Sequence, residues 1–194
     1  MRMLKKIAIG VVVVLVLLAL AGWWVVRGEP ASLTLDQVTG IKPELADPNF
    51  RETVVLVTQT DDSSTVGVIL NRPSEVRHEP TGEPVFSGGP VMPRTMVALF
   101  RSEAVPAAPA FHVLQGLYLS MHPAIFEGLK PPYRLYAGFA GWAPGQLQSE
   151  IARDDWYVLP ASEELVFRRD STGMWQELVD RAHAHRTRGP DARM

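Results

Sequence analysis

Side chains that could carry out chemistry are few, and their spacing fits none of the common catalytic or metal sites. Ser120 and His122 lie too close along the chain to define a catalytic triad, and the G-x-S-x-G nucleophile motif is absent. His183 and His185 are two positions apart, so on a helix they would point to different faces and make a poor metal pair. The acidic turn at 61–64 lacks the spacing and the glycine of a calcium loop. The sequence therefore predicts no catalytic residue, no metal and no cofactor.

Turn-rich segments that follow strands are better candidates, and they indicate binding. The stretch 139–151, "FAGWAPGQLQSEI", leads from a strand into a helix, and the free amides of its first turn could bind an anion or a carbonyl together with the Gln146 side chain. Two other turns also follow predicted strands, and Arg72 could add a fixed positive charge to the site. The candidate residues for binding a ligand or partner are Asn71, Arg72, Gly88, Gly89, Trp142, Gly145 and Gln146.

The same residues also have structural interpretations. Within 139–145, glycine permits positive φ and close backbone approach, and Pro144 suits the first turn of a helix. Gly88 and Gly89 could simply form a turn. Trp142 could fold back over the sheet and cap the core. Arg72 could lie at a solvated strand end beside Glu75. The sequence leaves both interpretations open and favours the structural one.

The segments that must position these residues are mainly short strands separated by turns. β-branched runs at 53–58 and 66–70 predict two adjacent strands, and further strands are expected in "VFSGGPVMP", "TMVALFRS", "FHVLQGLYLS" (with Gly116 as a bulge), "YRLYAGFAG" and "DDWYVLP". Helices are expected in "HPAIFEGL", after Pro144, and in "GMWQELVDRAHAHR", with a helical turn in "SEELVF". This order lacks regular strand–helix alternation, so it predicts an α+β fold with a mixed, largely antiparallel sheet and short flanking helices.

An uncharged apolar run at 7–26 follows a basic start at 1–6. Its 20 residues would span roughly 30 Å as a helix, which is the thickness of the hydrocarbon core of a bilayer. Because the basic residues precede the run, we expect a single-pass inner-membrane protein with a cytoplasmic N-terminus and an extracytoplasmic body. The alternative is a secretory signal peptide cleaved after Ala21.

The expected organisation has five parts. These are the basic cytoplasmic start at 1–6, the transmembrane helix or signal peptide at 7–26, a juxtamembrane linker at 27–46, a folded domain at 47–186 and a flexible tail at 187–194. After residue 27 the chain has 15 basic and 21 acidic residues, a formal charge of −6. An acidic body without a dense basic stripe argues against direct binding of nucleic acid.

Four blocks resemble the YqgE/AlgH family in their order and spacing. They are "DPNFRETVVLV", "GVILNRP", "GGPV" and "AGFAGWAPGQLQSEI" with a downstream "W", "LVF" and "W", and they run from about Asp47 to Trp175. The resemblance implies a single α+β domain whose sheet curls into a pseudo-barrel, with no established catalytic residues or cofactor. It also implies the family's label, transcriptional regulator. This chain departs from the family in three places: its membrane segment, the stretch "TLDQVTGIK" where the family has a leading apolar strand, and Gln148, where the family commonly has glutamate.

The sequence thus predicts a membrane-anchored, non-catalytic binding or regulatory domain. It would contact the bilayer through 7–26 and engage a protein partner or a small anionic ligand through the strand-end residues. One alternative is an uncharacterised enzyme, hydrolytic for example, that uses the same surface. Another is an indirect regulator of transcription, because a tethered body outside the cytoplasm cannot reach a promoter. The sequence predicts no oligomeric state.

Overall fold

A computed structural model describes residues 38–41, 48–60, 65–114 and 116–187. The predicted membrane segment or signal peptide at 7–26 lies outside these residues, as does nearly all of the predicted tail. Within the described ranges, no helix is both long and apolar enough to cross a bilayer.

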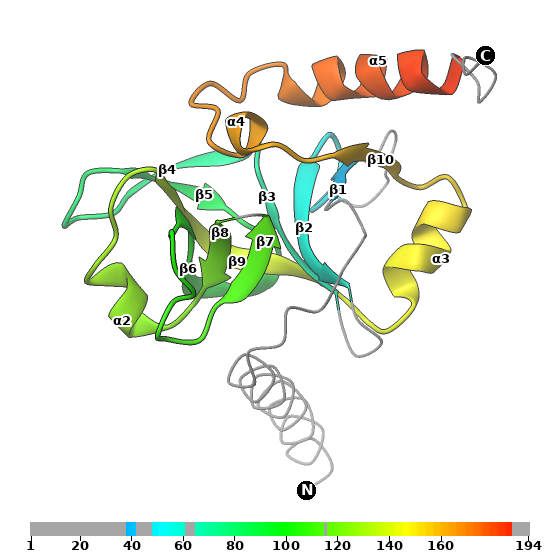
Figure 1. Ribbon diagram of the computed structural model, residues 1–194. Helices are drawn as coiled ribbons and strands as arrows, with labels where there is room; N and C mark the ends of the chain where they lie inside the picture. The colour runs from blue at the N-terminus through cyan, green and yellow to red at the C-terminus, as the bar shows by residue number, and fades with distance from the viewer. Residues whose placement is uncertain (1–37, 42–47, 61–64, 115, 188–194) are drawn as a thin grey trace, which may run out of the picture. The chain divides into compact units, whose positions relative to one another are not determined.

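Ten strands form one connected sheet (Figure 1). They are β1 (Val38–Ile41), β2 (Val54–Thr60), β3 (Thr65–Ile69), β4 (Pro73–Arg77), β5 (Pro84–Ser87), β6 (Val91–Arg101), β7 (Phe111–Leu114), β8 (Leu117–Ser120), β9 (Tyr133–Trp142) and β10 (Tyr157–Pro160). The main order is β10-β1-β2-β3-β9-β6-β8-β7, while β5 pairs with β9 and with β4. Only the β5–β9 pairing is parallel among the described strands.

The sheet nearly closes into a barrel, because β7 at one end of the order lies against β2. Leu56 of β2, Val113 of β7 and Leu117 of β8 are fully buried in the same core. Together with the few short helices, this confirms the predicted α+β fold with a largely antiparallel, curled sheet.

Among the described residues, four helices flank the sheet: α2 (Pro123–Phe126), α3 (Gln146–Ala152), α4 (Glu163–Val166) and α5 (Met174–Thr187). Each lies where the sequence predicts a helix or helical turn. Pro123 occupies the first turn of α2, and the His122 side chain accepts a hydrogen bond from the Ala124 N–H. The Ser162 side chain caps α4 by accepting from the Leu165 N–H.

α3 and α5 cover opposite faces of the sheet near β2 (Figure 1). Successive residues of a strand point to opposite faces. Leu56 accordingly packs in the same cluster as Leu178 of α5, whereas Val55 packs in a second cluster with Leu147 of α3. The strands at this end of the sheet therefore lie between the two helices.

Three expectations about the elements need correction. Residues 38–41, inside the predicted linker, form β1, which pairs with both β2 and β10. The stretch 111–120 is not one bulged strand but the antiparallel pair β7 and β8, because Gly116 has a φ of 75° and the chain turns there. β6 begins earlier than predicted, at Val91, and its pairing with β9 is irregular between Val91 and Met96.

Candidate functional site

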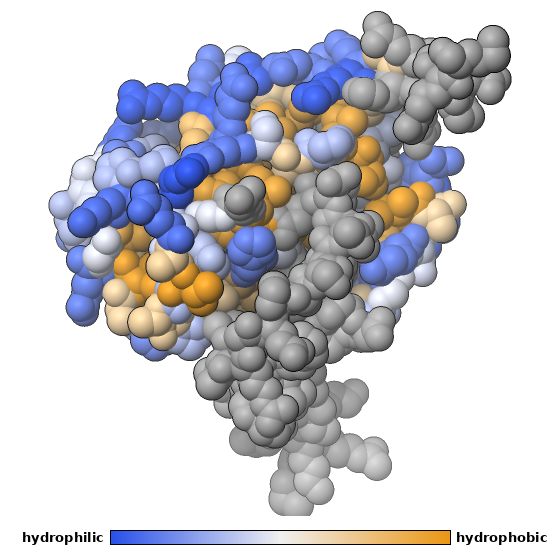
Figure 2. Space-filling model, viewed as in Figure 1, coloured by the Kyte–Doolittle hydropathy of each residue, from blue (hydrophilic) through white to orange (hydrophobic). Residues whose placement is uncertain are grey.

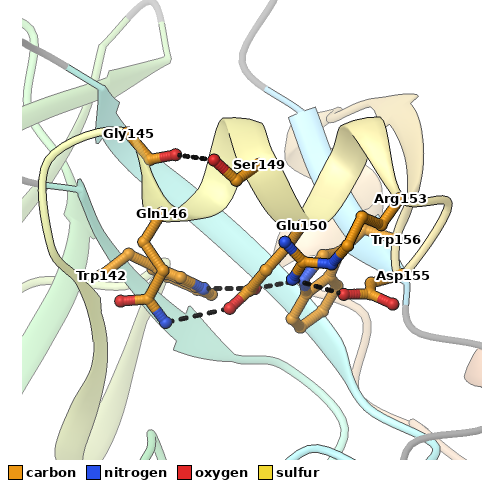
Figure 3. Close-up of polar contacts among 8 residues, drawn as sticks. All are labelled: Trp142, Gly145, Gln146, Ser149, Glu150, Arg153, Asp155 and Trp156. Atoms are coloured by element: carbon orange, nitrogen blue, oxygen red, sulfur yellow. Dashed lines mark hydrogen bonds and ion pairs between the residues drawn. The ribbon is translucent and has the colours of Figure 1, made fainter.

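The Glu150 carboxylate accepts hydrogen bonds from three side chains at the corner where β9 leads into α3 (Figure 3). Its Oε2 accepts from the indole Nε1 of Trp142 at 3.0 Å and of Trp156 at 2.8 Å. Its Oε1 accepts from Nε2 of Gln146 at 2.9 Å, and Oε1 of Gln146 accepts from the Ala143 N–H at 3.0 Å. The corner is therefore a hydrogen-bond network centred on one carboxylate.

Three aromatic rings pack beneath this network. The rings of Trp142 and Trp156 are 5.9 Å apart at 73°, and Phe50 stacks on Trp142 at 6.2 Å and meets Trp156 edge-on at 6.1 Å. Both tryptophans are buried in the core beneath α3. Trp142 thus caps the core, as its structural interpretation predicts, a burial that stabilises the fold by a few kcal/mol. We call Phe50, Trp142, Glu150 and Trp156 the tryptophan–glutamate cluster.

Arg72 fixes the loop that carries Phe50. Its guanidinium donates to the carbonyl oxygens of Asn49 at 2.6 Å, Arg51 at 3.0 Å and Pro48 at 3.3 Å. A planar group with several N–H donors can serve three acceptors at once. The charge of Arg72 is therefore directed at backbone oxygens on both sides of Phe50.

Asn71 supports the same loop from its other end. Its Oδ1 accepts from the Val54 N–H at 2.8 Å, and its Nδ2 donates to the Glu52 carbonyl at 2.9 Å. Glu52 has a φ of 54°, a conformation that is unfavourable for a residue with a Cβ. Asn71 thus stabilises a strained turn at the start of β2.

Gly88 and Gly89 lie where the chain between β5 and β6 crosses β9. A Cβ on Gly88 would lie 2.2 Å from the Gly138 carbonyl oxygen, and one on Gly89 would lie 2.3 Å from the carbonyl carbon of Phe139. A Cβ on Gly138 would lie 2.6 Å from the carbonyl oxygen of Gly89. The two backbones approach so closely that only glycine fits, whereas the sequence predicts a turn at Gly88 and Gly89.

The seven predicted residues do not form one surface. Trp142 pairs with Thr65 at the start of β3, whereas the Gly88 carbonyl accepts from the Ile69 N–H at the end of β3. Asn71 and Arg72 contact the loop that bears Phe50, and Phe50 in turn packs against Trp142 at the α3 corner. A ligand role for the seven residues stays a prediction, and Glu150 beside Gln146 disfavours an anionic ligand there because like charges repel.

A groove beside the corner was not predicted from the sequence. It has a volume of about 370 Å³ and is lined by Ile151, Asp154, Trp156, Tyr157, Val158, Leu159 and Ala182. We call it the β10 groove. Val158 is 41% exposed, which is high for a large aliphatic side chain, and Trp156 belongs to both the groove and the tryptophan–glutamate cluster. The apolar "WYVL" stretch indicates a strand, but the position of this strand in the sheet depends on its pairing with β1.

A buried charged residue lies in the main core. Arg134, 7% exposed, donates to the carbonyl oxygens of Leu70 and Arg168, and its guanidinium lies 4.5 Å from the ring centroid of Phe86. The fully buried Tyr136 hydroxyl has no hydrogen-bond partner among the described residues. Burial raises the pKa of Tyr136 to about 12, although the nearby positive charge of Arg134 opposes the rise. Arg134 thus ties β9 to the segment between α4 and α5.

Comparisons with known proteins agree with the fold. The family model described as AlgH-like matches residues 39–186. A UPF0301 protein of Thermobifida fusca is 35% identical over 162 residues, which cover 72% of this chain and 82% of that protein. These relationships extend the folded domain to include β1, ahead of the predicted start at residue 47.

Two solved structures are similar to this one. A crystal structure of a protein from Corynebacterium diphtheriae has a TM-score of 0.62 and 27% identity, covering 80% of this chain and 88% of that chain. The solution structure of the AlgH protein from Pseudomonas aeruginosa has a TM-score of 0.64 and 23% identity, covering 80% and 92%, a likeness that shows the fold alone. The resemblance predicted from the sequence blocks is confirmed, and the chain belongs to the AlgH-like family.

Proposed function

We propose that this protein is a membrane-anchored, non-catalytic domain that binds a protein partner. The anchor is the apolar run at 7–26, with the N-terminus in the cytoplasm and the body outside it. An uncharged run of this length after a basic start supports this topology.

The observation that carries the binding role is the β10 groove. Its lining is mainly aliphatic and aromatic, and Val158 stands exposed within it. Apolar surface rimmed by polar residues is typical of sites where proteins associate. Trp156 is held by Glu150 and packed against Trp142, so this part of the lining is ordered before any partner arrives.

Charge favours a protein partner over a small anion. The α3 corner centres on the Glu150 carboxylate, and Asp154 adds another carboxylate to the groove lining. A phosphate or a small carboxylate would meet negative charge at both places. A neutral or basic polypeptide would not be repelled by these carboxylates.

Fractionation of cells that make the full-length chain tests the anchor. We expect the protein to stay in membranes washed with alkaline carbonate, and a variant with Val14→Arg and Leu18→Arg to leave them, because charges within the bilayer core are costly. Intact mass then distinguishes an uncleaved anchor from cleavage after Ala21. Full-length wild-type protein in a salt-washed, detergent-free supernatant would contradict the anchor.

Site-specific photo-crosslinking in intact cells tests the partner. A photoreactive amino acid at Val158 should give a discrete protein adduct. The same amino acid at Val105, which is 73% exposed and does not line the groove, should not. Identical adduct patterns at the two positions would contradict a binding role for the groove.

A further inference from the structure

β4 is an exposed strand at the margin of the sheet. It pairs with β5 alone among the described strands. Pro73, Glu75, Val76 and Arg77 are all exposed, so side chains on both faces of the strand meet solvent. Val76 is 61% exposed, which is high for a large aliphatic side chain. β4 therefore offers a surface that another molecule could contact.

The middle of β4 is not in a regular ladder with β5. The register of the two strands is irregular between Pro73 and Arg77. The Ser74 hydroxyl spans this part, because it donates to the Val85 carbonyl at 2.7 Å and accepts from the Val76 N–H at 3.2 Å. The segment around Val76 is thus held by the Ser74 side chain where the ladder is interrupted, so any contact made there would depend mainly on side chains.

Two opposite charges flank Val76. Glu75 comes directly before it and Arg77 directly after it. The Glu75 carboxylate makes no ion pair within the described part of the chain. The Arg77 guanidinium donates to the Gly82 carbonyl at 3.2 Å, and its other N–H groups can serve a further acceptor. Both charges are therefore available to a molecule outside the chain.

The order of these charges is complementary to itself. When two β4 strands lie antiparallel with their Val76 residues opposite each other, Glu75 of each copy lies opposite Arg77 of the other. Opposite charges directly across an antiparallel contact stabilise it. A parallel alignment would place Glu75 opposite Glu75 and Arg77 opposite Arg77, and like charges in these positions are unfavourable. The charge order therefore favours an antiparallel arrangement of two identical strands.

The surroundings of β4 favour a polar contact. Figure 2 shows mainly hydrophilic residues over the part of the visible face where Figure 1 labels β4. An apolar peptide would therefore find little apolar surface here besides Val76. A second copy of this chain supplies both the matching charges and another Val76.

We propose that two copies of this chain associate through β4, in an antiparallel contact centred on Val76. Two ion pairs between Glu75 and Arg77 form on one side of the strands, and the two Val76 side chains meet on the other. The contact is isologous, since each copy contributes the same residues, and it closes as a dimer. β4 has five residues, so the contact area is small and the association is weak. The proposal does not depend on the anchor or on the β10 groove, which involve other residues.

Disulfide crosslinking in cells that make the full-length chain tests this proposal. The chain has no cysteine, so Val76→Cys introduces a single thiol, and diamide, which enters cells, oxidises neighbouring thiols to a disulfide. In the proposed contact the two thiols lie opposite each other, within reach of a disulfide. Val105→Cys, at a side chain that is 73% exposed, is the matched control for random collision. Non-reducing gels measure the fraction of crosslinked dimer.

The charges are tested in the Val76→Cys background by Glu75→Arg, by Arg77→Glu and by both together. In each single variant both cross-strand pairs become like-charged, whereas the double variant exchanges the signs and restores two attractive pairs. The two single variants are also made together in one cell, one of them with a tag that changes its size. Unlike copies then carry complementary charges, and like copies do not.

We expect Val76→Cys to crosslink at least about fivefold more than Val105→Cys, and each single charge reversal to lower the dimer fraction at least about fivefold. The double reversal should restore most of the dimer, and the co-expressed single variants should form the mixed dimer in preference to either homodimer. Three results would overturn the proposal: equal crosslinking at positions 76 and 105, equal crosslinking of the single and double reversals, or no preference for the mixed dimer. A discrete adduct of Val76→Cys with a different protein in place of the dimer would also overturn it and would assign β4 to that protein.

Discussion

Trp142 and Trp156 donate their indole N–H groups to the same carboxylate oxygen, Oε2 of Glu150, at 3.0 and 2.8 Å. One tryptophan ends β9 and the other lies just before β10, so this oxygen links both strands to α3. Leu147 is the single buried residue of α3. A short helix with so little buried surface therefore depends on this polar link for its position.

Replacing Glu150 by alanine should destabilise the protein by about 3 kcal/mol, because two buried indole donors would lose a charged acceptor. Glu150→Gln should cost less, since an amide oxygen still accepts. Chemical denaturation of the detergent-solubilised protein, followed by tryptophan fluorescence, measures both changes. Gln148→Ala, at an exposed position of the same helix, should stay within about 0.5 kcal/mol of wild type. Equal stability of Glu150→Ala and wild type would show that the link does not hold α3.

Alanine substitutions at Gly138 and Gly145 distinguish the energetic cost of a left-handed backbone from the cost of steric overlap. Their φ values are 71° and 73°, but a Cβ on Gly138 would meet backbone oxygens at 2.6 and 2.8 Å, while one on Gly145 would have no atom within 4 Å. Gly145→Ala should cost about 1–2 kcal/mol, the penalty of a left-handed alanine. Gly138→Ala should cost several kcal/mol or prevent folding. Thermal melts of the two variants provide the comparison, and similar losses would refute the close crossing of β9.

Arg72→Lys should destabilise the protein by about 1–2 kcal/mol, although the positive charge is retained. One ammonium group cannot reproduce the three contacts to the carbonyls of Pro48, Asn49 and Arg51. Tryptophan emission should shift as well, because Phe50 loses its fixed position beside Trp142. Arg77→Lys is the control: Arg77 makes one exposed hydrogen bond to the Gly82 carbonyl, so its replacement should have little effect on the urea midpoint. No change in either signal for Arg72→Lys would contradict the proposed support of the loop.

The buried Tyr136 hydroxyl predicts a loss of stability in alkali. The folded-state pKa is about 12 and the ordinary value is 10.0, so the stability from this group is fully present below pH 10 and falls as the pH rises toward 12. Two pKa units correspond to about 3 kcal/mol. Tyr136→Phe should be as stable as wild type or about 1 kcal/mol more stable at pH 7, because the hydroxyl has no partner among the described residues.

Urea denaturation at pH 7 and pH 11 checks this prediction. The advantage of Tyr136→Phe over wild type should grow at the higher pH. A Tyr136→Phe variant that loses stability equally at both pH values would contradict this prediction, because the hydroxyl would then stabilise the folded state.

Local signals in the sequence were sufficient to predict much of the fold. Pro123 marked the start of α2, the glycines of β9 indicated close backbone approach, and Gly88 and Gly89 indicated a turn after β5. Trp142 was expected to cap the core, and it does. Each of these features depends on the residue itself or on its immediate neighbours, so composition and spacing carry the information.

The features that sequence reasoning missed depend on partners far along the chain. β1 is four residues long and becomes a strand through β2 and β10, whose Tyr157 pairs with Ile41. The role of Glu150 requires Trp142 and Trp156 to meet beneath α3, and the acceptors of Arg72 lie more than twenty positions before it. The β10 groove was missed for the same reason, since its floor is a strand only when β1 is in place.

The position of β1 between β2 and β10 has a consequence for protein synthesis. A ribosome releases β1 first and β10 more than a hundred residues later, so the nascent chain holds a half-paired strand for most of its translation. Until Pro160 emerges, β1 has a neighbour on one side alone. A chain that stalls in this interval would expose the unpaired edge of β1 to other chains. Cells that make this protein would need a chaperone or a nearby surface that covers this edge.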